Sequence, residues 1–115
     1  MKQLPFILLC LIAFFFLKKI FFDNTDYKAI LVSGGIIVDV RSEAEFYSGH
    51  IENSLNIHLL DLPSKLDYLQ DKDQAIITCC ASGFRSGGTQ KLLSANCYTI
   101  VINGGGWSNL ECKLK

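Results

Sequence analysis

The segment from Cys80 to Ser86, Cys-Ala-Ser-Gly-Phe-Arg-Ser, brings a thiol, a glycine and a guanidinium together within seven residues. It joins an apolar run that predicts a buried strand to a stretch that predicts a helix. A thiol beside a helix N-terminus and near Arg85 is favoured as thiolate, which is the reactive form. Gly83 allows a tight curve in which successive backbone N–H groups converge on an anion. An inert buried cysteine would explain neither the glycine nor the arginine, so the segment predicts a nucleophilic cysteine.

Two adjacent cysteines compete for this role. Counted from Cys80 the loop reads C-x-x-G-x-R-S, which leaves room for a sulfur atom. Counted from Cys79 it reads Cys, five residues, Arg85, Ser, which resembles the signature of Cys-dependent phosphatases and arsenate reductases and is wide enough for a tetrahedral oxyanion. Those enzymes commonly place His before the nucleophile, where Thr78 stands here. Because Cys79 continues the apolar strand pattern, Cys80 is favoured, and the Cys79 interpretation remains the alternative.

The elements around this loop predict an α/β fold. Strands are expected over 36–40, 75–79 and 98–102, and helices over 27–32, 43–48, from 62 onward and over 86–93, the last ended by Asn96 in a left-handed conformation. Strands that alternate with helices imply a mostly parallel sheet with helices on both faces. Ligands of such sheets bind at the carboxyl ends of the strands, which points to the segments after Val40 and Cys79.

Further motifs surround the loop in a fixed order. Upstream lie Asp39-Val40-Arg41, Glu45-Phe46, Gly49-His50-Ile51 and Asn56-Ile57, and downstream lies Gly104-Gly105-Gly106-Trp107. In this order and at these distances the set resembles a single-domain rhodanese, a member of the sulfurtransferase family. The resemblance covers roughly residues 26–107.

The resemblance implies a parallel sheet of about five strands and a sulfurtransferase activity. Cys80 would take a sulfane sulfur from thiosulfate or another persulfide and pass it to a thiophilic acceptor, with no metal or organic cofactor. Arg85 would neutralise charge at the loop rim or brace the loop by hydrogen bonds. The backbone amides of the loop would bind the transferred sulfur; these belong to Ala81, Ser82, Gly83, Phe84 and Ser86. A persulfide carrier without independent turnover is a further alternative.

Several nearby residues are interpreted as structural. Asp39 and Arg41 are expected to tie neighbouring loops together, His50 to pack in a loop, and Trp107 to close the sheet edge. Three features depart from the family pattern. The glycines adjoin Trp107 directly, and the eight residues after it predict an absent or reduced closing helix. The loop also has Ala81 and Ser82 where users of thiosulfate often carry a basic residue, which leaves the donor open.

The first 22 residues differ from the rest in composition. They carry three lysines and no acid, whereas residues 23–115 carry eight Lys and Arg against eleven Asp and Glu, a net charge of −3. That remainder is long enough for one compact domain, which the resemblance identifies as a rhodanese-like domain over 23–115, and its acidic charge excludes a nucleic-acid partner. Residues 4–17 are uncharged, and with snorkelling lysines the apolar stretch 4–22 can span a bilayer. The prediction is an N-terminal hydrophobic helix that forms a single-pass membrane anchor or uncleaved signal over 1–22; an exported or periplasmic protein is the alternative.

Overall fold

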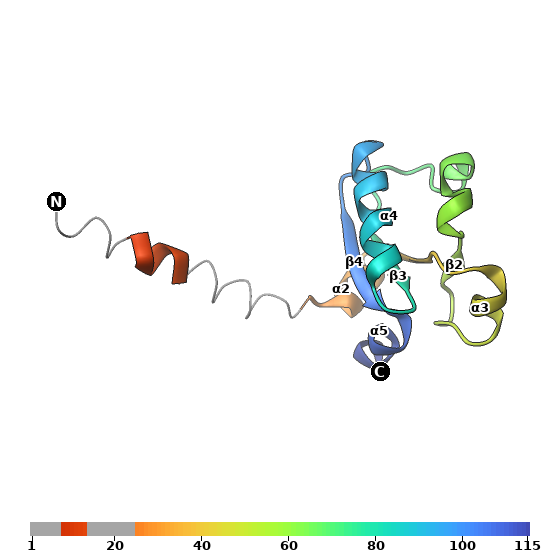
Figure 1. Cartoon of the computed structure of the whole chain (residues 1–115), viewed down its shortest axis with the longest axis horizontal. Helices are drawn as coiled ribbons and strands as arrows, with labels where there is room; N and C mark the ends of the chain where they lie inside the picture. The colour runs from red at the N-terminus through yellow and green to blue at the C-terminus, as the bar shows by residue number, and fades with distance from the viewer. Residues whose placement is uncertain (1–7, 14–24) are drawn as a thin grey trace.

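The computed structural model describes residues 8–13 and 25–115 of the chain. From residue 25 onward it forms a parallel sheet in the order β2-β1-β3-β4, with helices on both faces (Figure 1). The strands are β1 (Ile36–Asp39), β2 (Leu55–Asn56), β3 (Ile76–Cys80) and β4 (Val101–Gly106). The helices are α2 (Tyr27–Val32), α3 (Glu43–Tyr47), the 3-10 helices η1 (Leu59–Ser64) and η2 (Leu66–Tyr68), α4 (Phe84–Ala95) and α5 (Trp107–Leu114). The predicted α/β fold is therefore confirmed, although the described sheet has four strands rather than about five.

The predicted N-terminal anchor lies mostly outside the described residues, which include only its residues 8–13. Residues 8–13 are helical, with exposed side chains (Figure 1). Within the two described ranges, no helix is long and apolar enough to cross a membrane. The anchor over 1–22 therefore stays a prediction of the sequence.

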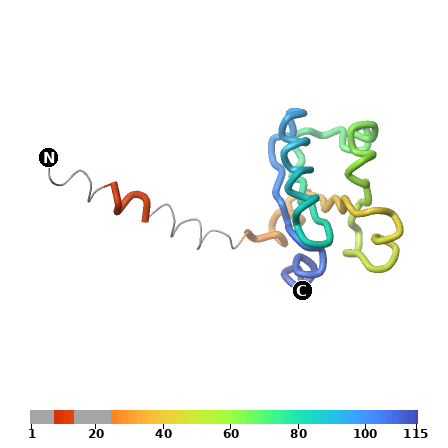
Figure 2. The backbone as a smooth tube through the Cα atoms, in the orientation of Figure 1, coloured from red at the N-terminus to blue at the C-terminus, as the bar shows by residue number. Residues whose placement is uncertain are grey.

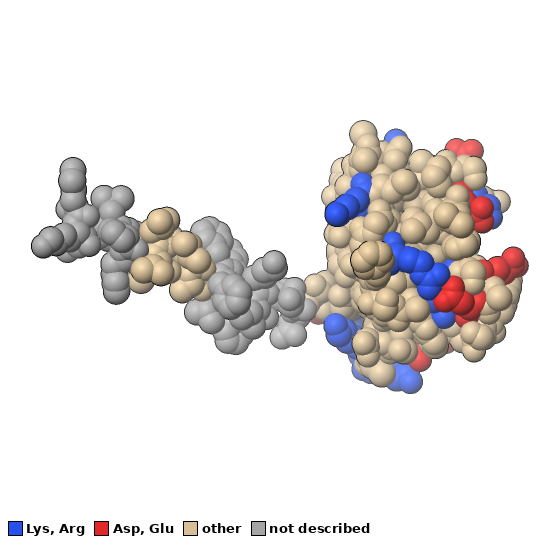
Figure 3. Space-filling model, viewed as in Figure 1, with Lys and Arg blue, Asp and Glu red and all other residues tan. Residues whose placement is uncertain are grey.

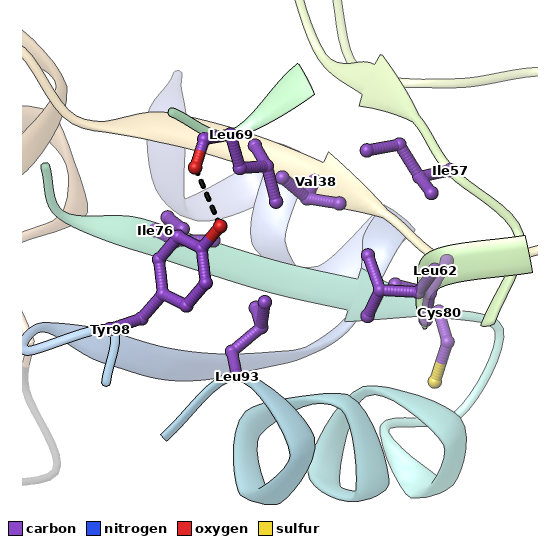
Figure 4. Packing of buried hydrophobic residues seen from close by; sticks show 9 residues of the cluster. Val38, Ile57, Leu62, Leu69, Ile76, Cys80, Leu93 and Tyr98 are labelled. Atoms are coloured by element: carbon purple, nitrogen blue, oxygen red, sulfur yellow. Dashed lines mark hydrogen bonds between the residues drawn. The ribbon is translucent and has the colours of Figure 1, made fainter. Parts of the chain in front are cut away.

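The two central strands are buried on both faces, as their β-branched composition predicts. β1 and β3 pair in parallel from Ile36↔Ile76 to Asp39↔Cys79, so their carboxyl ends coincide. One face packs under α4 and the two 3-10 helices, through an apolar cluster that includes Val38, Ile57, Leu62, Leu69, Ile76, Cys80, Leu93 and Tyr98 (Figure 4). The other face packs under α2 and α5, through Tyr27, Ile37, Ile51, Ile77, Cys79 and Leu110.

The capping residues place the short helices as the sequence predicts. Asp26 caps α2 by accepting the N–H of Ala29, and Ser42 and Glu45 form the expected capping box of α3. The helix expected from residue 62 instead forms η1 and η2. Pro63 lies inside η1, where it has no N–H to donate to an α-helical hydrogen bond.

The C-terminal third differs most from prediction. β4 begins at Val101 rather than Tyr98, because the Tyr98 ring packs in the core and its hydroxyl donates to the Leu69 carbonyl at 2.6 Å (Figure 4). The closing helix, expected to be absent or a turn, is the eight-residue α5, held by the fully buried Leu110. Cys97, not Asn96, takes the left-handed conformation after α4.

α4 lies along β4, and α5 turns off the end of β4 near the loop that joins β3 to α4 (Figure 2). The carboxyl ends of β1, β3 and β4 thus meet where the sequence predicts the reactive loop.

Candidate active site

Cys80 is the last residue of β3, and hydrogen-bond donors surround its sulfur. Sγ accepts the backbone N–H of Gly83 at 2.8 Å and that of Ser86 at 3.4 Å, and it lies 3.5 Å from the Ser86 hydroxyl. Figure 4 shows the sulfur at the end of the strand, directed toward the start of α4. Cys80 is fully buried beneath the loop.

This environment makes the Cys80 thiol more acidic than an ordinary cysteine. Burial by itself would raise its pKa, but the hydrogen bonds from the Ser86 side chain and from the loop backbone outweigh it. The net result is a pKa below the usual value, because each donor stabilises the thiolate more than the thiol. The arrangement therefore supplies a nucleophilic sulfur together with donors that stabilise negative charge on it.

Gly83 provides the tight curve predicted for the loop. Its φ of +93° lies in the left-handed region, and a Cβ there would lie 3.1 Å from Cα of Gly105. Gly106 is equally close-packed, since its Cβ would lie 3.0 Å from the Ala81 carbonyl oxygen. The glycines that precede Trp107 thus allow β4 to pack directly against the loop between Cys80 and Ser86.

Asn103 joins the loop to β4. Its Oδ1 accepts the hydroxyl of Ser86 at 2.5 Å and the N–H of Gly105 at 2.9 Å, and its Nδ2 donates to the Gly83 carbonyl at 3.3 Å. The pairing of β3 with β4 is irregular here: Thr78 pairs with Asn103, and Cys80 with Gly106, so β4 holds one extra residue. This bulge fixes the Ser86 hydroxyl beside Sγ.

Arg85 forms a two-pronged ion pair with Glu45. Nη1 lies 2.8 Å from Oε1 and Nη2 lies 2.8 Å from Oε2, which is the strong fork geometry. The Arg85 hydrogen bond, followed by those of Ser42, lowers the Glu45 pKa to about 2, and the Glu45 hydrogen bond raises the pKa of Arg85. Both groups are charged at neutral pH. Of the two roles predicted for Arg85, this contact is the loop-bracing one.

Asp39 and Arg41 have the structural role that the sequence predicts. The two side chains are buried, with Nη2 of Arg41 2.7 Å from Oδ2 of Asp39. The same guanidinium donates to the carbonyls of Glu45 at 3.2 Å and Gly49 at 2.7 Å, and it stacks 4.7 Å from the Trp107 ring centre. Arg41 therefore fixes α3 and the following loop to the end of β1.

Two further expectations concern His50 and Trp107. The His50 ring stacks on Phe46 at 3.8 Å, and its Nδ1 lies 2.9 Å from the Phe46 carbonyl oxygen, so its loop-packing role is confirmed. Trp107 was expected to close the sheet edge. Its ring lies against the Arg41 guanidinium, and a Cβ added at Gly49 would lie 3.1 Å from its Cη2 atom.

Cys79 points away from the loop. It lies in the apolar cluster under α2 and α5, whereas Cys80 lies in the cluster on the opposite face. Burial, and then the charge of Asp39, raise the pKa of Cys79 to about 12. A thiol that is protonated at neutral pH and faces away from Arg85 cannot attack a ligand in this loop, so the geometry argues against the alternative nucleophile.

The remaining predicted loop residues differ in placement. Among the described residues, the N–H groups of Gly83 and Ser86 are hydrogen-bonded to Sγ, and the Ser82 backbone also contributes to the lowered pKa of Cys80. No such contact is found for Ala81 or Phe84 in the part of the chain that the structure describes. Phe84 is 89% exposed. Elsewhere in ranges 8–13 and 25–115, no three His, Cys, Asp or Glu side chains gather as a metal site would need.

Neither Asn103 nor the partner of Arg85 is among the predicted site residues. Asn103 is a polar residue near the carboxyl end of an apolar strand, and the rule that sites form at such ends could have singled it out. The sequence places Glu45 in a helix cap and a family motif, and nothing in its spacing indicates contact with Arg85, forty positions later.

Comparisons with known proteins agree with this architecture. The chain is 34% identical over 70 residues to a putative sulfurtransferase, YtwF, from Bacillus subtilis, covering 60% of this chain and 67% of that protein. It is 28% identical over 74 residues to the thiosulfate sulfurtransferase PspE from Escherichia coli, covering 64% and 71%. A solved E. coli rhodanese with anions superimposes with a TM-score of 0.63 at 27% identity, over 66% of this chain and 91% of that one. The sequence model of the Rhodanese-like domain family matches residues 23–111, and the chain belongs to that family.

Proposed function

We propose that this chain is a sulfurtransferase in which Cys80 carries the sulfane sulfur as a persulfide. The observation that carries the proposal is the position of Sγ, which accepts two backbone N–H groups and lies beside the Ser86 hydroxyl at the start of α4. This is the environment that a thiolate, and then an anionic persulfide, requires. The relatives named as sulfurtransferases support the same reaction class.

The reaction needs two displacements at sulfur. The Cys80 thiolate attacks the outer sulfur of a donor such as thiosulfate; a new S–S bond forms on Cys80, and sulfite leaves with the electron pair of the broken S–S bond. An acceptor thiolate then attacks the outer sulfur of the persulfide and restores the Cys80 thiolate. Charge balances in both steps, and neither requires an external oxidant or a proton.

The chain's own groups hold the negative charge during both steps. The N–H groups of Gly83 and Ser86 stabilise charge on Sγ, and Asn103 holds the Ser86 hydroxyl in place. Arg85 braces the loop against Glu45 on α3.

Intact mass spectrometry tests the proposal directly. The full chain is incubated with thiosulfate or with a persulfide donor, beside Cys80→Ser and Cys79→Ser variants. We expect a gain of one sulfur atom, removable by cyanide, in the wild type and in Cys79→Ser but not in Cys80→Ser. No gain with either donor, or a gain lost in Cys79→Ser alone, would overturn it. Loading without discharge to added thiols would instead indicate the carrier alternative.

A further inference from the structure

The charge of the reactive loop is cancelled by a residue of another element. Arg85 is the single ionic residue between Cys80 and Ser86. Its guanidinium is bound by both carboxylate oxygens of Glu45, each at 2.8 Å. The Arg85 side chain is 33% exposed and the Glu45 side chain 38% exposed, so the pair lies at the rim of the site. The next pair inward, Asp39 with Arg41, is also neutral as a whole. An incoming anion therefore meets no uncompensated cation from these two pairs.

We propose that Glu45 determines which charge class of sulfur donor the site accepts. It occupies two N–H donors of the guanidinium that would otherwise bind a donor's oxygens, and it adds a carboxylate at the rim. The site then disfavours a dianion such as thiosulfate and favours donors of lower charge, such as thiosulfonates or organic persulfides. This inference rests on the proposed role of Cys80.

Glu45 keeps this charge across the working pH range. Its pKa is lowered to about 2, chiefly by the Arg85 hydrogen bond and then by Ser42, so the carboxylate is ionised well below neutrality. The Ser42 N–H and hydroxyl both bind Oε1, at 3.2 and 2.9 Å, and hold the carboxylate in place at the N-terminus of α3. The carboxylate is thus a fixed feature of the rim.

A matched pair of donors isolates the effect of charge. Thiosulfate carries two negative charges and methanethiosulfonate carries one, and both give the same product. The Cys80 thiolate attacks the outer sulfur, the S–S bond of the donor breaks, and sulfite or methanesulfinate leaves with the electron pair. The measurement is the second-order rate constant for loading of sulfur on Cys80 with each donor, in a single turnover of the full chain.

The informative variant is Glu45→Gln, since glutamine can still accept from Ser42 in the capping box. Because Coulomb energy scales with the donor's charge, we expect loading by thiosulfate to rise on the order of tenfold and loading by methanethiosulfonate by roughly threefold. The ratio of the two rate constants should therefore rise, and the rise should shrink as salt is added.

Glu43→Gln is the matched control. Glu43 lies on the same helix and has the same formal charge, but it lines a separate pocket with Tyr47 and His58 and forms no ion pair with Arg85. We expect its donor ratio to equal that of the wild type. An equal rise in both variants would overturn the inference, because it would reflect the charge of the whole helix.

The outcomes separate this inference from the proposed function. Failure of the wild type to load sulfur from either donor would refute the proposed function. Loading by both donors, with the same ratio in the wild type and in folded Glu45→Gln, would refute the role of Glu45 alone. Circular dichroism and thermal melting establish that the variant is folded.

Discussion

Cys79 and Cys80 are neighbours in β3, yet their side chains lie on opposite faces of the sheet, in two separate apolar clusters. Successive side chains of a strand alternate between faces, so only one of the two can face the loop at the strand end. The two thiols consequently differ in acidity: the pKa of Cys80 is lowered and that of Cys79 is raised to about 12.

Alkylation should distinguish the two thiols across pH. Since the pKa of Cys80 lies below its usual 9.0, its rate of reaction with iodoacetamide should reach half its maximum below pH 9. Cys79 should remain unmodified throughout that range, because its thiolate forms only near pH 12. Peptide mass spectrometry separates these sites from the exposed Cys97 and Cys112. Equal modification of Cys79 and Cys80 in the folded chain would contradict the assignment.

Asn103→Ala should stabilise the thiolate without removing any group that touches Sγ. The Ser86 hydroxyl donates its single proton to Asn103 Oδ1 at 2.5 Å, so the substitution frees that proton for donation to Sγ, 3.5 Å away. We expect the midpoint of Cys80 alkylation to fall by roughly 0.5–1 pH unit, the equivalent of about one hydrogen bond. Asn103→Asp should raise it instead, because a carboxylate still accepts the Ser86 proton and adds a negative charge near the thiolate. An unchanged midpoint in both variants would show that Asn103 has a packing role alone.

Gly83→Ala should destabilise the fold by about 1–3 kcal/mol, since alanine at this positive φ is strained. Its Cβ would also lie 3.1 Å from Cα of Gly105, so the loop must move off β4 and sulfur loading should slow. Gly88→Ala in α4 is the control, because nothing lies within 4 Å of the new Cβ. That substitution should stabilise the helix by about 0.5–1 kcal/mol. Denaturant unfolding measures both, and equal stability of the two variants would argue against strain at Gly83.

Asp39→Asn should destabilise the fold by about 3–5 kcal/mol, because it leaves the buried Arg41 without its counter-charge. The guanidinium is 4% exposed and cannot turn to water without releasing α3. Glu111→Gln removes one partner of the exposed pair with Lys115 and should change stability by less than about 0.5 kcal/mol. Thermal unfolding compares the two. A small effect of Asp39→Asn would mean that Arg41 is held by the backbone carbonyls and Trp107.

The sequence predicts those parts of the fold that local chemistry decides. The capping box at Ser42 and the β-branched runs of β1 and β3 appear where expected, because a cap or an alternation pattern needs only neighbouring residues. The predicted start of β4 at Tyr98 is wrong, because the Tyr98 side chain packs in the core and donates to the carbonyl of Leu69, twenty-nine positions earlier in the chain. That contact is tertiary and leaves no local pattern.

The features of the candidate site also fall into those that the local sequence predicts and those that depend on tertiary contacts. The choice of Cys80 over Cys79 follows from strand alternation, and the curve at Gly83 follows from residue type. The ion pair of Arg85 with Glu45 and the hydrogen bond of Ser86 with Asn103 join different elements, so they become visible only when the sheet brings the strand ends together.

Arg41 and Arg85 both bind α3, Arg41 through backbone atoms and Arg85 through a side chain. Arg41 binds backbone carbonyls at Glu45 and Gly49, which every residue type supplies, whereas Arg85 binds the carboxylate of the Glu45 side chain. The Arg41 contacts to α3 therefore need no particular side chain at position 45, whereas the ion pair with the loop needs the Glu45 carboxylate. One carboxylate thus serves two purposes: it caps the start of α3 and it neutralises the cation of the reactive loop, so a single substitution at position 45 alters both while the Arg41 contacts to α3 remain.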